Sequence, residues 1–212
     1  MLHKYLLKPC SILFLIAGGC CAQSISLGVK GGAHLLDDAP CCGLTSESRR
    51  YVVGPMVQIG LSSGFSVEVD ALYRRVGSVS LPITPTPVYW DHTRQRINSW
   101  EFPLLLRYTF RTPAIKPYVE AGYAPRVGSG HVDSYGVSPD EYYHEPVPYS
   151  YHADASWDVS QGIVAGGGVQ FTAGRWRFSP EIRYTWWHVP AFASQTAQNQ
   201  LDLMVGIGWK LR

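Results

Sequence analysis

The chain has 212 residues, of which 46% are hydrophobic and only 16% are charged. Its formal net charge of +2 at pH 7 excludes the strongly basic surface that proteins binding nucleic acid usually carry. Aromatic residues make up 13% of the chain and no helical period is convincing, so the composition favours β-structure. No segment after the N-terminus approaches the roughly 20 consecutive apolar residues of a membrane-spanning helix.

The N-terminus has the order of features of a secretory signal peptide. Lys4 and Lys8 precede an apolar run, Ser11 to Ile16, and small residues follow that run. We expect residues 1–22 to be the signal peptide, with cleavage after Ala22. Cleavage removes both lysines and lowers the formal charge to 0, because 16 basic residues then face 16 acidic residues.

A single domain, residues 23–212, is expected to remain after cleavage. The alternative is a lipoprotein signal at Cys20 or Cys21, although the usual apolar residue is missing before the small residues. The mature chain keeps only the adjacent Cys41 and Cys42, which cannot form a disulfide framework. They are interpreted as two loop thiols or a vicinal disulfide without a redox function.

Eight segments of the mature chain alternate between large apolar residues and small or polar residues, which is the period of a β-strand. Each has 9 to 13 residues, about the length that a tilted strand needs to cross a bilayer. The segments are residues 25–33, 51–61, 65–76, 98–110, 116–127, 161–171, 175–187 and 200–211.

The connections between these segments alternate in length. The short ones are residues 62–64, 111–115 and 172–174, and the long ones are residues 36–50, 77–97, 128–160 and 188–199. An up-and-down barrel with both chain ends at its short-turn end has this rhythm. In outer-membrane barrels the short turns lie in the periplasm and the long loops lie outside the cell.

The two faces of each segment differ in chemistry, one being apolar and aromatic and the other charged. An eight-stranded barrel has an interior too narrow for so many aromatic rings, so the apolar face must contact lipid. Six aromatic residues near strand ends fit interfacial girdles: Trp100, Tyr108, Trp176, Tyr184, Trp186 and Trp209. The prediction is an all-β fold, an eight-stranded antiparallel up-and-down transmembrane β-barrel in the bacterial outer membrane.

The inward face mixes both signs of charge in nearly equal number. Buried charges are costly unless they are paired, so we expect an ion-pair network that plugs the lumen. Its members would be Lys30, Glu68, Asp70, Arg74, Glu101, Arg107, Glu120, Arg126, Arg177, Glu181, Arg183 and Asp202. The alternative is a narrow pore or a proton path through the same residues.

Three stretches carry a family resemblance. "SWEFPLLLRYTF" and "IKPYVEAGYAP" resemble the "LEIPLLLKY" and "KPYVGAG" strands of the bacterial outer-membrane protein β-barrel family that includes PorT-like proteins, and "FSVEVDALYRRVG" is similar to the strand before them. The match covers residues 28–127 well and the last three strands more loosely. It implies an OmpA-type barrel inserted by the barrel-assembly machinery, but no activity. The chain departs from many barrels by ending in Lys-Leu-Arg instead of Phe.

The third long connection is acidic and aromatic. Between Val127 and Gly174 there are six acidic residues and no Lys or Arg, which argues against a polyanionic partner for this loop. The candidate binding surface consists of Tyr135, Tyr142, Tyr143, His144, Tyr149, Tyr151, His152 and Trp157. A weak divalent-cation site with His144 and His152 is an alternative, but no regular metal-ligand spacing is present and no metal or cofactor is predicted. The plainest interpretation is a soluble surface loop.

Acyl chemistry on membrane lipids is the enzymatic alternative. Its candidate groups are His188 with Ser194, or His131 with Asp133 and Ser134. Neither set reproduces an acyl-hydrolase or acyltransferase motif, so no enzyme is predicted. The sequence predicts a monomer that contacts outer-membrane lipid and has a structural or surface-interaction role, with an extracellular ligand bound through the loops.

Overall fold

The computed structural model describes residues 24–36, 44–80, 90–112, 115–139, 145–188 and 197–211. The expected signal peptide and the Cys41–Cys42 pair lie outside these residues. In the part of the chain that is described, no helix has the length and apolar character needed to cross a membrane.

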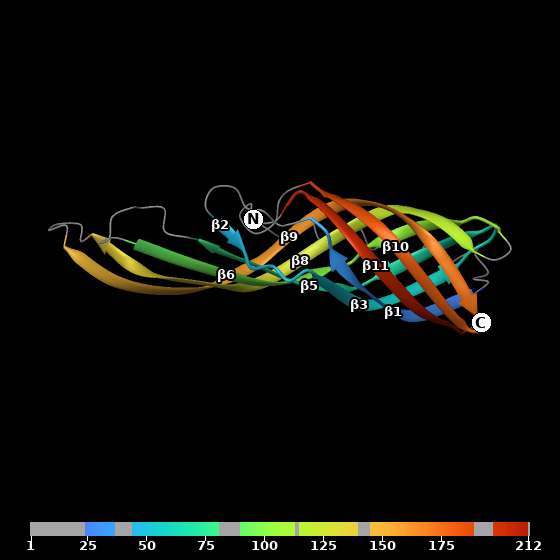
Figure 1. The fold of residues 1–212 in the computed structure, drawn as a ribbon, viewed down its shortest axis with the longest axis horizontal. Helices are drawn as coiled ribbons and strands as arrows, with labels where there is room; N and C mark the ends of the chain where they lie inside the picture. Colours follow the sequence, from blue (N-terminus) through green and yellow to red (C-terminus); the bar gives the residue numbers. More distant parts are fainter. Residues whose placement is uncertain are drawn as a thin grey trace, which may run out of the picture.

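The described strands belong to one antiparallel sheet that closes on itself (Figure 1). They are β1 (Ser24–His34), β2 (Leu44–Ser46), β3 (Tyr51–Gly60), β4 (Phe65–Asp70), β5 (Leu72–Ser80), β6 (Trp90–Glu101), β7 (Leu104–Thr109), β8 (Lys116–Pro139), β9 (Pro146–Ala173), β10 (Trp176–Trp187) and β11 (Asn199–Lys210). β4 with β5, and β6 with β7, each form one barrel strand with a short interruption. The wall therefore has eight strands, as predicted, and the pairing of β8 with β9 closes it.

The interruptions lie side by side in the wall. Ala71 separates β4 from β5 and donates its amide to the Pro55 carbonyl at 3.0 Å. Pro103 lies between β6 and β7 and accepts from the Asp70 amide at 3.1 Å, and Phe102 donates to the Pro125 carbonyl at 2.9 Å. Proline has no amide hydrogen to donate, so regular pairing breaks at these positions while single hydrogen bonds continue the wall.

The short turns and both described chain ends lie at one end of the barrel. Ser26 in β1 pairs with Lys210 in β11, and Lys210 donates its amide to the Arg175 carbonyl of the last turn. The turns use left-handed backbone at Ser63, with φ of 59°, and at Gly64 and Gly174, with φ of 88° and 62°. The predicted short connections at residues 62–64 and 172–174 are confirmed.

The prediction of loops is wrong for residues 77–80, 90–97, 128–139 and 146–160, which lie in strands. β5 and β6 pair as far as Val79 and Arg94, and β8 and β9 pair as far as Pro139 and Pro146. These extensions form an arm beyond the barrel, which we define as residues 76–80, 90–98, 128–139 and 146–159 together with β2. Figure 1 shows it projecting away from the end that carries the C-terminus. The many Gly, Ser, Pro and Asp residues suggested loops, but cross-strand pairing overrides local propensity here.

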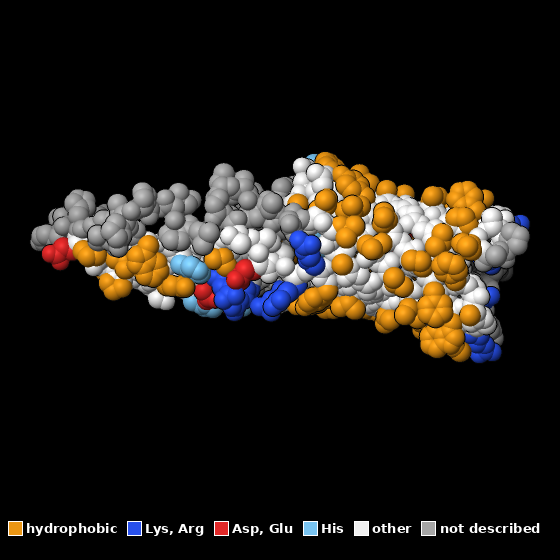
Figure 2. Space-filling view, in the orientation of Figure 1, with side chains coloured by type: hydrophobic (Ala, Val, Ile, Leu, Met, Phe, Trp, Pro, Cys, Tyr) orange, Lys and Arg blue, Asp and Glu red, His pale blue; other side chains and the backbone are white. Residues whose placement is uncertain are grey.

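The wall of the barrel is apolar outside and polar inside, the reverse of a water-soluble sheet. Side chains pointing outward across the wall, 46–61% exposed, include Val29, Leu106, Val119, Ile163, Ile182 and Val205. They form the apolar surface that covers the barrel in Figure 2. Of the predicted girdle residues, Tyr108 is half-buried and the other five are 37–49% exposed on the same surface. The predicted outward orientation is therefore confirmed for these girdle residues.

Candidate functional site

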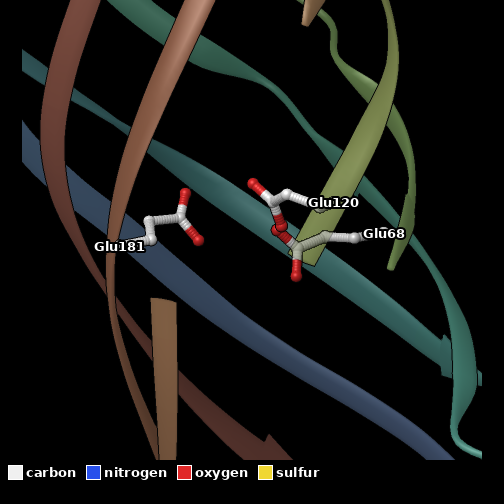
Figure 3. A group of neighbouring side chains, drawn as sticks. All are labelled: Glu68, Glu120 and Glu181. Carbon is white, nitrogen blue, oxygen red and sulfur yellow. The ribbon is translucent and has the colours of Figure 1, made fainter. Parts of the chain in front are cut away.

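Three carboxylates from different strands meet in the lumen. Glu68, Glu120 and Glu181 point toward one another from β4, β8 and β10 (Figure 3), with oxygen atoms within 4.8 Å of one another. Such a group would suit a cation. However, protein cations already contact all three carboxylates, so a metal ion would have to displace them.

Lys30, Arg107 and Arg183 supply that positive charge. The Arg107 Nη2 atom lies 2.8 Å from Glu68, 2.7 Å from Glu120 and 3.2 Å from Glu181. The Arg183 guanidinium lies 2.9 Å from Glu181 and 3.1 Å from Glu120, and Lys30 contacts Glu68 and Glu181. We call these six residues, with Asp70, the lumen cluster.

The lumen cluster has four acids and three bases, all buried. Asp70 accepts from Lys30 at 3.2 Å and from Arg183 at 3.0 Å, and the Tyr118 hydroxyl donates to Glu181 at 2.8 Å. Arg107 also lies 3.9 Å above the Tyr118 ring. Buried ions are tolerated when hydrogen bonds replace their lost hydration. Most polar atoms of the lumen cluster meet that condition, while the Asp70 Oδ1 and Glu181 Oε1 atoms are buried without a hydrogen-bond partner among the described residues.

A second polar layer lies between the lumen cluster and the arm. Trp187 is fully buried, donates to Gln200 at 2.9 Å and carries the Arg126 guanidinium 3.8 Å above its ring. Gln200 in turn donates to Glu101 at 3.2 Å and to Asp202 at 2.8 Å. This layer therefore connects an aromatic ring, an arginine and two acids across the lumen.

The remaining predicted lumen residues have different surroundings. Arg74 is buried on the inner face, close enough to Glu101 to act on its charge. Arg177 donates to the amide oxygen of Gln58, so its hydrogen-bond partner is not one of the expected carboxylates.

Several buried lumen residues were not in the predicted network, and His34, Tyr118 and Trp187 are three of them. His34 lies 2.8 Å from Asp202, and Tyr118 and Trp187 are both buried in the lumen. Counting in steps of two from Glu120 to Tyr118, and from Arg183 to Trp187, would have placed both rings inside. The rule that aromatic side chains face lipid concealed this signal.

The arm carries the described part of the predicted binding surface. Tyr135 is 45% exposed, stacks on His92 at 4.7 Å and meets Trp90 edge-on at 5.8 Å. Tyr151 is 60% exposed. The Tyr149 hydroxyl donates to Asp91 at 2.5 Å, and this hydrogen bond raises the pKa of Tyr149.

The other members of that predicted surface cannot be placed on it. Tyr142, Tyr143 and His144 lie outside the described residues, as does the side chain of Trp157.

Histidine and aspartate side chains gather on the outward face of the arm. The His152 Nδ1 atom lies 2.6 Å from Asp133, and this hydrogen bond lowers the pKa of the Asp133 carboxyl. His131 is 3.9 Å from the same carboxylate. Ser134 points to the opposite face of the strand, where its hydroxyl lies 2.8 Å from that of Thr93.

The structure does not assemble either enzymatic candidate within the described residues. His131 and Asp133 lie on one face of β8 and Ser134 lies on the other. His188 packs edge-on against Trp186, with ring centroids 6.0 Å apart, and its proposed partner Ser194 lies outside the described residues.

Comparison with solved structures defines the class of protein. Neisserial surface protein A (NspA) superposes with a TM-score of 0.51 and 13% identity, covering 91% of this chain and 99% of that protein. The OmpT protease of Escherichia coli superposes with a TM-score of 0.46 and 10% identity, covering 91% of this chain and 98% of that protein. The N-terminal barrel of Pseudomonas aeruginosa OprF superposes with a TM-score of 0.42 and 12% identity, covering 89% of this chain and 97% of that domain. No family model and no curated protein sequence matches the chain. The chain has the fold of an eight-stranded outer-membrane β-barrel.

Proposed function

We propose that this protein is a monomeric outer-membrane barrel that presents its arm to partners outside the cell. The observation that carries the proposal is the paired, multi-stranded arm, which holds exposed Trp90, Tyr135 and Tyr151 on a fixed backbone. Rigid aromatic side chains supply contact area at a small cost in conformational entropy. NspA, which shares the fold, is by name a surface protein.

The lumen cluster serves as a structural plug in this proposal. Three bases from β1, β7 and β10 contact four acids from β4, β8 and β10, so they tie distant strands together across the lumen. A pore would need these contacts to open. Purified barrel in planar bilayers should therefore show no steady conductance, and large stable openings would refute the plug.

Acyl chemistry on membrane lipid is the less favoured alternative. The placement of Ser134 on the face opposite His131 speaks against it, since a nucleophile must reach its base. We further propose, on the motifs of residues 65–125, that the chain is related to PorT-like barrels and is inserted by the barrel-assembly machinery.

Deleting the outer arm tests the surface role. His131 and Asp154 are cross-strand partners, so an Asn-Gly turn can replace residues 132–153 and leave the barrel strands intact. Cells displaying the shortened protein should lose adhesion to a panel of other cells and matrix surfaces at equal surface density. The double variant Tyr135→Ser/Tyr151→Ser should reproduce most of that loss.

A matched control changes two aromatic residues on the barrel wall. Trp176 and Trp209 are exposed on the lipid-facing surface, and their ring centroids are 4.8 Å apart. The double variant Trp176→Phe/Trp209→Phe should therefore leave adhesion intact. Undiminished adhesion by the arm deletion would reject the proposal.

A further inference from the structure

An arginine-lined cavity opens on the outward face where the barrel meets the arm. Its volume is about 480 Å³, and its walls include Arg49, Arg75, Arg94 and Arg96 with Glu47 and Ser48. We call it the arginine pocket. In Figure 2, Lys and Arg side chains gather where the apolar barrel surface ends. No sequence motif marks this pocket, because its arginines come from three separate segments of the chain.

Strand pairing brings the four arginines together. The segment after β2 runs beside β5, with the Glu47 amide donating to Gly77 at 2.8 Å and the Arg49 amide donating to Arg75 at 2.9 Å. On the other side of β5, Gly77 pairs with Arg96. Strand alternation turns the intervening Val76 and Ile97 inward, so the arginine side chains share the outward face.

Gly77 forms the floor of the arginine pocket. A Cβ atom at this position would lie 3.1 Å from the Gln95 carbonyl oxygen and 3.4 Å from the Glu47 Cβ atom. Because no side chain stands between Glu47 and the β6 arginines, a hollow remains in the middle of the sheet surface. The Ser48 hydroxyl lies 3.2 Å from the Gly77 amide and fixes the neighbouring segment.

The arginine pocket keeps an excess of positive charge. Glu47 holds Arg94 in a two-pronged contact, with the Arg94 Nε and Nη2 atoms 2.7 and 3.0 Å from its carboxylate. Arg96 also acts electrostatically on Asp133 of the neighbouring strand β8. Within the described ranges, no carboxylate forms an ion pair with Arg49, Arg75 or Arg96. Three guanidinium groups therefore face the hollow with donors to spare.

The position of the arginine pocket relative to the apolar belt indicates its ligand. Tyr73 and Trp100 pack on the outer wall with ring centroids 5.3 Å apart, and the Tyr73 hydroxyl donates to Asn98 at 2.7 Å. Aromatic residues of this kind mark the head-group level of a membrane. Arg75 follows Tyr73 by two residues, about 7 Å along a strand. The arginines thus lie at the depth of lipid phosphate groups.

We propose that the arginine pocket binds a phosphate-type oxyanion, carried on the head group of an outer-leaflet lipid. Guanidinium groups bind phosphate through paired, charge-assisted hydrogen bonds, and their planar geometry suits a site with several arginines. Binding would fix the base of the arm against the membrane surface. The site is separate from the arm aromatics, so it does not depend on the adhesion proposal.

Binding is measured with refolded protein in micelles of an uncharged detergent. The first titration adds phosphatidic acid, with phosphatidylcholine as the comparison lipid. The second titration adds inorganic phosphate or pyrophosphate. Phosphatidic acid should bind saturably, and Arg75→Gln/Arg96→Gln should weaken it about tenfold, the effect of losing roughly 1.4 kcal/mol of charge-assisted contact. Gly77→Ala, which adds a methyl group to the floor of the pocket without changing charge, should weaken binding too.

The control variant removes the same charge elsewhere. Arg111 and Arg175 are exposed at the short-turn end, so Arg111→Gln/Arg175→Gln should bind phosphatidic acid as the parent protein does. Heat-modifiable gel mobility verifies that each variant is folded. Equal weakening by both double variants, or no weakening by Arg75→Gln/Arg96→Gln, would overturn the proposal. If inorganic phosphate bound as tightly as the lipid and lost affinity in Arg75→Gln/Arg96→Gln, that result would support an oxyanion site but reject a lipid as the source of the oxyanion.

Discussion

The barrel and the arm share strands, and the polarity of two of these paired strands reverses at the junction. On the outward face, Tyr73 and Trp100 are followed two residues further out by Arg75 and Asn98. On the inward face, the buried ions of the lumen give way to the apolar pair of Val76 and Ile97, each 2% exposed. The polarity of both faces thus reverses within two or three residues along two paired strands. This change locates the boundary between lipid and water more sharply than the length of any strand does.

Removing one base from the lumen cluster should have the largest effect on stability. Arg183→Met keeps much of the volume but leaves four buried acids with two bases. The free energy of unfolding should fall by about 4 kcal/mol, as for other buried pairs that lose one partner. Urea unfolding in lipid vesicles measures this change. Arg111→Met at the exposed short-turn end is the control, and equal stability of the two variants would contradict an ionic plug.

A charge introduced on the outer wall should lower the free energy of unfolding by a smaller amount, and the loss should differ between the barrel and the arm. Val205 is 46% exposed in the middle of β11, and Val205→Arg should cost about 2 kcal/mol because its charge would lie in lipid. Tyr151→Arg on the arm, at 60% exposure, should change the unfolding free energy by less than about 0.5 kcal/mol. If both substitutions lowered the free energy of unfolding by similar amounts, the arm would lie in the membrane and not outside it.

The smallest expected effect is a local pH response of the arm. The hydrogen bond from His152 lowers the pKa of Asp133, so the contact is intact above the ordinary carboxyl range and is lost as pH falls through the lowered value. Carbon NMR of Asp133 in micelles should show a midpoint below that of free aspartate. His152→Ala should return the midpoint toward the ordinary value, and an unchanged midpoint would refute the contact.

The barrel was predictable because alternation and turn length are local signals. Glu68, Arg107 and Arg183 stand at inward positions of strands that the period alone identifies, and "SSG" and "TAG" mark tight turns. The partner of each charged side chain was less predictable, since no local pattern shows that Arg177 contacts Gln58 or that Arg107 and Arg183 share three glutamates.

The arm and the arginine pocket escaped prediction for a different reason. The strand character of residues 128–139 depends on pairing with β6, which is distant in sequence, and with β9, which follows next in the chain. Arg49 and Arg96 come from segments that the sequence analysis assigned to two separate loops. Only the closed sheet brings them to opposite sides of Gly77, so a basic site spread over three segments has no motif to find.

The line of prolines across the wall has a mechanical consequence. Pro55, Pro103 and Pro125 lie on three of four successive barrel strands, with the break at Ala71 on the strand between Pro55 and Pro103, and none of the prolines can donate a ladder hydrogen bond. By contrast, β1 and β11 pair without a break over nine residues on a different part of the circumference. Sideways pressure from the bilayer should therefore flatten the cylinder along the proline line first, and solvent deuterium should enter its flanking amides before those of β1.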